Sequence, residues 1–270
     1  MRRRFGTDYL REEFERLGAA LEQPTNVYLI GGGSMSFRDL KAATKDIDLV
    51  ITDRGALSRI QAALGGLDYR EVQSPGDEHV SLGAQAVLEN EDGCRFDIFV
   101  QQVAGTLVFS DGMRQRSEQF LQNGNLTVDL VSPEDIFLFK SVAGRTDDVE
   151  DMSVLVQTGL DFETIRGEIR SQVELLDEEL FVTDVNESLL ELEERFGITT
   201  PIEPFLAEET DRIYRELEVM MAFEEQTTVS ALCDELGRAE EEVLTLLDSL
   251  EVKGVIQREG VEVRKIGERP

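Results

Sequence analysis

The sequence predicts an α+β fold, because the residue pattern changes character twice along the chain. Over residues 1–160, short apolar strands alternate with amphipathic helices, which is typical of a mixed sheet with helices packed on it. Residues 161–205 form a strongly acidic helical stretch, which we interpret as a connector. Residues 206–270 follow the order helix, helix, β-hairpin, which is typical of a winged helix.

The individual elements follow from apolar periodicity and from the breaks between periodic segments. In the first segment we expect helices at 7–22, 34–40 (capped by Ser34), 56–64, 133–142 and 147–157. The strands expected there are 26–30, 46–52, 78–90 and 94–100, with a hairpin turn at Asp92-Gly93. Beyond residue 160 we expect helices at 161–180, 186–196, 211–223, 229–236 and 239–252, then strands at 255–258 and 261–264.

The composition sets limits on the class of protein. The formal net charge is −29, and the acidic residues are spread along the chain, which predicts a solvated acidic surface and resembles proteins of salt-accumulating halophiles. His79 is the single histidine, which argues against histidine-based metal or triad chemistry. Two distant cysteines, Cys94 and Cys233, argue against a disulfide or a zinc site and favour a cytoplasmic protein. No apolar run is long enough to predict a membrane span.

A glycine-rich turn follows the first strand and precedes a helix. Gly31, Gly32 and Gly33 would let backbone N–H groups approach a phosphate closely, and Ser34 could add a hydroxyl donor. The turn matches neither the dinucleotide-binding nor the P-loop glycine pattern. A purely structural strand-to-helix turn is the alternative.

Three aspartates are the candidate metal ligands. Asp46 and Asp48 are two residues apart on a strand, so their carboxylates point to one face while Ile47 points to the core. Such a pair is costly unless a cation binds between them or the strand exposes its polar face to water. Asp97 lies inside an apolar strand and needs a partner, either a metal shared with the pair or an arginine such as Arg95.

Together these segments resemble the DNA polymerase beta-like nucleotidyltransferase superfamily, over roughly residues 5–160. The sequence is most similar to small prokaryotic nucleotidyltransferases of the abortive-infection type, which occur in toxin–antitoxin systems. The resemblance is carried by the glycine turn, by Thr44-Lys45-Asp46-Ile47-Asp48, and by the segment from Lys140 through Arg145 and Asp148 to Asp151.

The resemblance implies that Asp46, Asp48 and Asp97 coordinate Mg²⁺ (or Mn²⁺) and that one of them, Asp97, orients or deprotonates the attacking hydroxyl. It implies that the nucleotide phosphates meet Gly32, Gly33 and Ser34 and lie near Lys140 and Arg145. Lys45 either contacts phosphate as well or offsets the charge of Asp46. The alternative for Lys140 and Arg145 is an ion-pair network with Asp148 and Asp151 on the helix surface.

The resemblance predicts an enzyme that moves an NMP from an NTP to a hydroxyl on an RNA end or a protein side chain. A local patch of Arg114, Arg116, Lys140 and Arg145 could hold an RNA end. A non-catalytic nucleotide- or partner-binding module of a toxin–antitoxin pair is the alternative.

The predicted winged helix has an acidic third helix, which works against DNA binding and favours dimerisation or docking of a protein partner. A DNA-binding regulator that uses Arg258, Arg264 and Lys265 stays an alternative.

Overall fold

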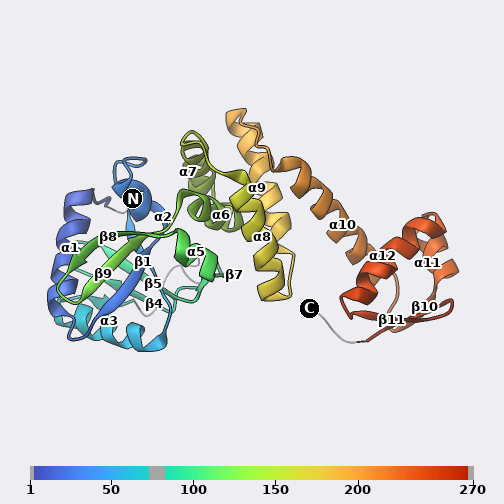
Figure 1. Cartoon of the computed structure of the whole chain (residues 1–270), viewed down its shortest axis with the longest axis horizontal. Helices are drawn as coiled ribbons and strands as arrows, with labels where there is room; N and C mark the ends of the chain where they lie inside the picture. The colour runs from blue at the N-terminus through green and yellow to red at the C-terminus, as the bar shows by residue number, and fades with distance from the viewer. Residues whose placement is uncertain (1–2, 73–82, 267–270) are drawn as a thin grey trace. The chain divides into compact units, whose positions relative to one another are not determined.

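The computed structural model describes residues 3–72 and 83–266, which form two compact units, Met1–Glu203 and Pro204–Pro270 (Figure 1). The predicted α+β class is confirmed: the first unit has a seven-stranded mixed sheet in the order β3-β4-β5-β2-β1-β9-β8. These strands are β1 (Thr25–Leu29), β2 (Asp46–Ile51), β3 (Arg70–Glu71), β4 (Ala86–Glu89), β5 (Arg95–Val100), β8 (Glu118–Asn123) and β9 (Leu126–Leu130). The pairs β2–β5 and β1–β9 are parallel, and the other neighbouring strands of the sheet are antiparallel.

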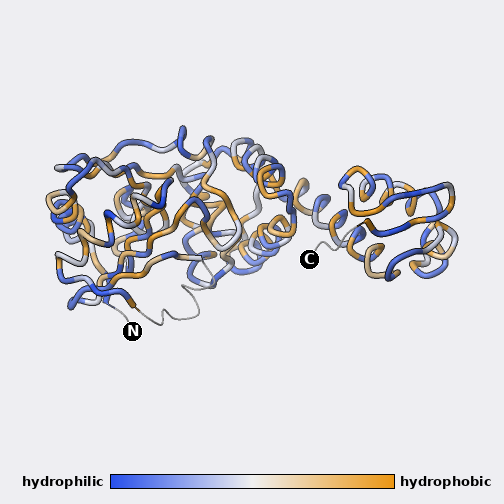
Figure 2. Tube along the Cα trace, turned by 90° about the horizontal axis from the view of Figure 1, so that it is seen from below, coloured by the Kyte–Doolittle hydropathy of each residue, from blue (hydrophilic) through white to orange (hydrophobic). Residues whose placement is uncertain are grey.

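One face of this sheet carries the apolar core. Alternate residues of the central strands, such as Ile47, Leu49 and Phe96, are fully buried in one cluster with side chains of α1 (Thr7–Ala20) and α3 (Arg54–Gly66). In Figure 2, apolar segments are concentrated in the interior of the first unit, and the colours alternate along the helices. Because successive side chains of a strand point to opposite faces, the intervening residues Asp46 and Asp48 must lie on the other face.

That other face is bordered by the rest of the first unit. The two-stranded sheet β6 (Gln102–Val103) and β7 (Leu107–Val108) is tied to α8 (Phe162–Leu176), since the Gln172 side-chain amide bonds both the N–H and the C=O of Val108. Helix α5 (Asp111–Arg116) follows β7, and α6 (Pro133–Ala143) packs with α7 (Thr146–Val156), α8 and α9 (Phe181–Phe196). Residues 161–205 were expected as a connector, and this stretch lies in the first compact unit as far as Glu203.

The second unit has its own core. Helix α10 (Glu203–Met221) is followed by β10 (Gln226–Thr228), α11 (Val229–Leu236), α12 (Glu240–Val252), β11 (Ile256–Glu259) and β12 (Glu262–Lys265). The strands form a sheet in the order β10-β12-β11, and Leu247 and Val263 lie in the buried apolar cluster of this unit. The predicted helices and hairpin occur in the predicted order, but strand β10 between α10 and α11 was not predicted, and the identification of this unit as a winged helix stays a prediction.

Several local predictions were wrong. Helix α2 spans Gly31–Phe37, so it begins at the glycines and Ser34 is not its cap. The hairpin β8–β9 was missed although Asn123-Gly124 is a strong hairpin signal, and α5 was missed as well. Helices α9 and α10 begin at Phe181 and Glu203, earlier than predicted, because packing of their first turns outweighs weak local periodicity. The first part of the predicted strand 78–90, including His79, lies outside the described residues. Within the described part of this range, the strand is β4.

Candidate functional site

The three candidate metal ligands lie on two neighbouring strands. In the parallel pair β2–β5, Asp48 is the register partner of Asp97, and Asp46 is the partner of Arg95. Directly paired residues of neighbouring strands point to the same face, so all three carboxylates share the face opposite the apolar core. Asp97 is 2% exposed, whereas Asp46 and Asp48 are half-buried.

The charges of these carboxylates interact strongly. Burial raises the pKa of Asp48 to about 8, and the negative charges of Asp97 and Asp46 contribute to the rise. The cations of Arg145 and Lys140 oppose it, which shows that they lie within Coulombic reach of Asp48. A carboxylate in this position favours either a proton or a bound cation.

The donor set fits a hard cation, since Mg²⁺ prefers carboxylate oxygens. Nevertheless, among residues 3–72 and 83–266 no three acidic, histidine or cysteine side chains are arranged as a ready cage for a metal ion. This geometry is compatible with Mg²⁺ because the ion is usually held by one or two carboxylates together with substrate phosphates.

The glycine turn packs directly against this carboxylate cluster. Gly31 has a φ of +60°, and a Cβ added to it would lie only 2.4 Å from Asp48 Oδ2. A Cβ on Gly32 would lie 2.6 Å from Thr44 Oγ1. Glycines are therefore required here for close approach of α2 to β2. Ser34 is fully buried, and its hydroxyl donates to the Val131 carbonyl at 3.5 Å, so in this structure it faces the protein interior.

Lys140 and Arg145 form the ion-pair network that was weighed as the alternative, in which Lys140, Asp148 and Asp151 are buried while the Arg145 side chain is 41% exposed. Lys140 Nζ lies 2.9 Å from Asp148 Oδ1 and 2.7 Å from Asp151 Oδ2. Arg145 donates through Nε to Asp148 Oδ2 at 2.6 Å. Burial alone would raise the pKa of Asp148, but the cations of Lys140 and Arg145 outweigh this effect and hold the pKa below its usual value.

Two lysines of the loop between α2 and β2 face α7. Lys41 Nζ bonds both carboxylate oxygens of Asp151, at 2.8 and 2.7 Å. Lys45, one of the predicted nucleotide-binding residues, pairs with Asp147 at 3.2 Å near the surface. Sequence analysis missed Lys41, because its partner lies 110 residues away and no local motif marks it.

The arginines that were expected to hold an RNA end have other partners. Arg116 donates to Asp135 at 2.7 and 3.1 Å and to Glu168 at 2.5 Å, and both carboxylates are buried. Arg114 pairs with Asp111 of its own helix. These contacts neutralise Arg116 in a structural network. Lys140 and Arg145 are paired as well, so all four cations of the predicted patch have carboxylate partners.

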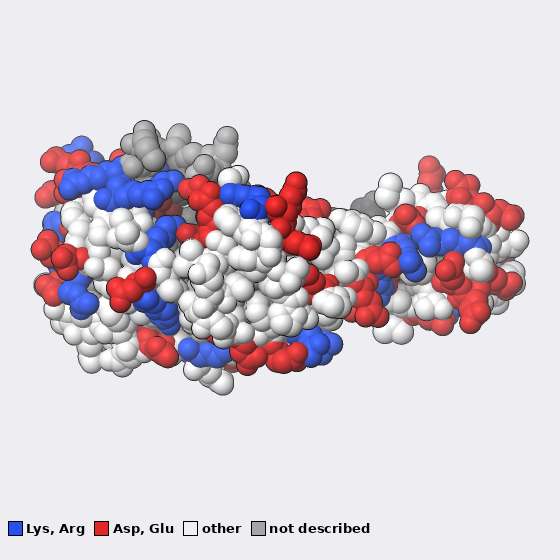
Figure 3. Space-filling model, turned by 90° about the horizontal axis from the view of Figure 1, so that it is seen from above, with Lys and Arg blue, Asp and Glu red and all other residues white. Residues whose placement is uncertain are grey.

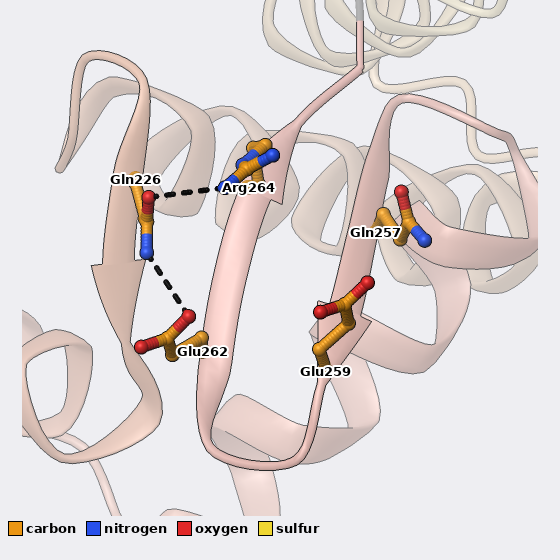
Figure 4. Close-up of a pocket in the computed structure, with 5 residues that line it drawn as sticks. All are labelled: Gln226, Gln257, Glu259, Glu262 and Arg264. Carbon is orange, nitrogen blue, oxygen red and sulfur yellow. Dashed lines mark hydrogen bonds between the residues drawn. The ribbon is translucent and has the colours of Figure 1, made fainter.

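In the second unit, the basic residues considered for DNA contact are also engaged. Arg258 pairs with Asp248 and Glu251 of α12, and Lys265 lies 4.9 Å from the Phe223 ring centroid. The outer face of the three-stranded sheet carries a small polar recess, where Gln226 accepts from Arg264 and donates to Glu262 (Figure 4). Three of its five lining side chains, Gln226, Glu262 and Arg264, are joined by these hydrogen bonds.

The mixed sheet, the glycine turn and the carboxylates on β2 and β5 define the nucleotidyltransferase class. Residues 9–196 match the family described as "Nucleotidyltransferase of unknown function (DUF6036)". This match covers more than half of the chain, and the protein belongs to that family. It extends beyond residue 160, in agreement with the packing of α8 and α9 into the first unit. No curated protein matches the chain. In the described part of the chain, no helix is long and apolar enough to cross a membrane.

Proposed function

We propose that this protein transfers an NMP from an NTP to a hydroxyl acceptor on an RNA end or a protein side chain, with release of pyrophosphate. The observation that carries the proposal is the pairing of Asp48 with Asp97 across β2 and β5, with Asp46 on the same face and Gly31 packed against Asp48. The family match supports nucleotidyl transfer in general.

The site residues have three proposed roles: metal binding, phosphate binding and proton transfer. Asp46, Asp48 and Asp97 would hold Mg²⁺ (or Mn²⁺), which when bound supplies charge stabilisation to the phosphates. Gly32 and Gly33 bring backbone close to the triphosphate, while Lys140, Arg145 and Lys45 supply positive charge around it. Asp97 accepts the proton of the attacking hydroxyl, whose oxygen bonds to the α-phosphorus as the bond to the pyrophosphate oxygen breaks.

The test separates chemistry from folding. Asp48→Asn is compared with Asp129→Asn, which changes a carboxylate on the same sheet face two strands away, where Asp129 accepts from Asn26 at 2.8 Å. We expect Mg²⁺-dependent NTP binding in the parent and in Asp129→Asn, and its loss in Asp48→Asn. NTP labelled at the α-phosphate then shows whether RNA or protein becomes labelled while pyrophosphate is released. If the parent binds no NTP with Mg²⁺, the proposal is wrong and partner binding becomes the better explanation.

A further inference from the structure

We propose that Lys41 is a further nucleotide-binding residue of this site, which contacts the β- and γ-phosphates of the NTP and is held in place by Asp151. The inference rests on the proposed function and adds a residue that belongs to none of the motifs that carry the resemblance to the superfamily. It starts from a network of three cations, Lys41, Lys140 and Arg145, around two buried carboxylates, Asp148 and Asp151.

Lys41 is a solvent-accessible member of this network. Its side chain is 26% exposed, compared with 41% for Arg145 and 8% for Lys140. The two bonds to Asp151 use two of the three ammonium donors, so a third is left for a phosphate oxygen. If Lys41 moves toward a ligand, Asp151 still has Lys140 at 2.7 Å, so no buried carboxylate is left without a cation.

The position of Lys41 matches the glycine turn. A Cβ on Gly32 would lie 3.7 Å from Lys41 Cδ, and one on the preceding Gly31 would lie 2.4 Å from Asp48 Oδ2. The Lys41 stem and the Asp48 carboxylate therefore border adjacent residues of the same turn. A triphosphate that approaches these glycines, with its metal-binding oxygens toward Asp48, would bring other phosphate oxygens toward the Lys41 ammonium.

The network also gathers cations in an acidic protein. Three cations surround the carboxylates of Asp148 and Asp151, within a chain whose formal net charge is −29. On the face of the first unit shown in Figure 3, Lys and Arg side chains gather beside a hollow, although acidic residues dominate the chain. Cations gathered in such a protein attract a polyanionic ligand.

The experiment measures Mg²⁺-dependent affinity for NMP, NDP and NTP by calorimetry on the full chain. Lys41→Met is compared with Lys41→Arg, with Asp48→Asn and with the matched control Lys253→Met. Lys253 is similar in exposure at 28% and also pairs with a buried carboxylate, Glu216, but it lies in the second unit. We expect Lys41→Met to weaken NTP binding by about tenfold or more, as for loss of a charge-assisted hydrogen bond, with NMP affinity unchanged. Lys41→Arg should restore the preference for NTP over NMP.

Each outcome decides between the two proposals. Loss of NTP preference in Lys41→Met, with Lys253→Met equal to the parent, supports the inference. Equal weakening of NMP and NTP would assign Lys41 a structural role and overturn it, as would unchanged NTP binding. If Asp48→Asn abolishes binding and Lys41→Met does not alter it, the proposed function stands and only the inference fails. A parent that binds no NTP overturns both.

Discussion

Gly31→Ala tests whether the glycine turn is shaped by the Asp48 carboxylate. The substitution combines two costs: a side chain at a φ of +60°, and a Cβ placed 2.4 Å from Asp48 Oδ2. The backbone cost is about 1 kcal/mol, and forcing an atom into a packed contact adds about 1–3 kcal/mol. We therefore expect a loss of about 2–4 kcal/mol in the free energy of unfolding.

A matched control isolates the second cost. Gly197 has a φ of +64°, and an added Cβ would meet nothing within 4 Å, so Gly197→Ala should cost only about 1 kcal/mol. In an Asp48→Ala background, Gly31→Ala should lower the free energy of unfolding by no more than Gly197→Ala does, because the carboxylate that the added Cβ would contact is absent. This rescue measures the contact itself.

Urea unfolding followed by tyrosine near-UV circular dichroism suits this comparison. The chain has no tryptophan, and three of its four tyrosines, Tyr9, Tyr28 and Tyr69, lie in the first unit. If Gly31→Ala and Gly197→Ala lose the same free energy, or if Asp48→Ala gives no rescue, the contact does not shape the turn and our account of the three glycines is refuted.

Three further outcomes are expected. Lys140→Met should lower the free energy of unfolding by about 3 kcal/mol, which is the low end for a broken buried ion pair. The loss stays at the low end because Asp148 still pairs with Arg145 and Asp151 still pairs with Lys41. Urea titration measures this loss, and a value near zero would contradict a buried network. The pKa of Asp48 is raised to about 8 from 3.8, so without metal the folded state holds a proton that the unfolded state releases. Stability should then fall as pH rises from about 4 to 8, and this slope should be smaller in Asp48→Asn when the melting temperature is measured across that range. Duplex DNA should not retain the chain even at low salt. The exposed side chains of α12 include Glu241, Glu242 and Asp248, and Arg258 is paired with Asp248 and Glu251, so little positive charge is available for phosphates. Retention that is lost in Arg258→Ala would overturn this prediction.

The sheet positions of the candidate carboxylates could be predicted from the sequence. A period of two separates Asp46 and Asp48 from the buried Ile47, and the strand pattern around Asp97 is equally clear. What the pattern could not predict is the register that pairs Asp48 with Asp97, because strand pairing depends on a partner 49 residues away. The predicted start of α2 at Ser34 was wrong because glycine is a poor helix former, and only the close approach to Asp48 and Thr44 explains the glycines there.

The sequence by itself determined the α+β class, the faces of the strands and the residue types of the candidate site, because these depend on local periodicity and chemistry. Tertiary structure alone decided which charges meet. Lys41 and Asp151 lie 110 residues apart, and the burial of Lys140 between two carboxylates follows from the packing of α6 on α7. The strength of an ion pair depends on distance and on exclusion of water, and both are properties of the folded chain.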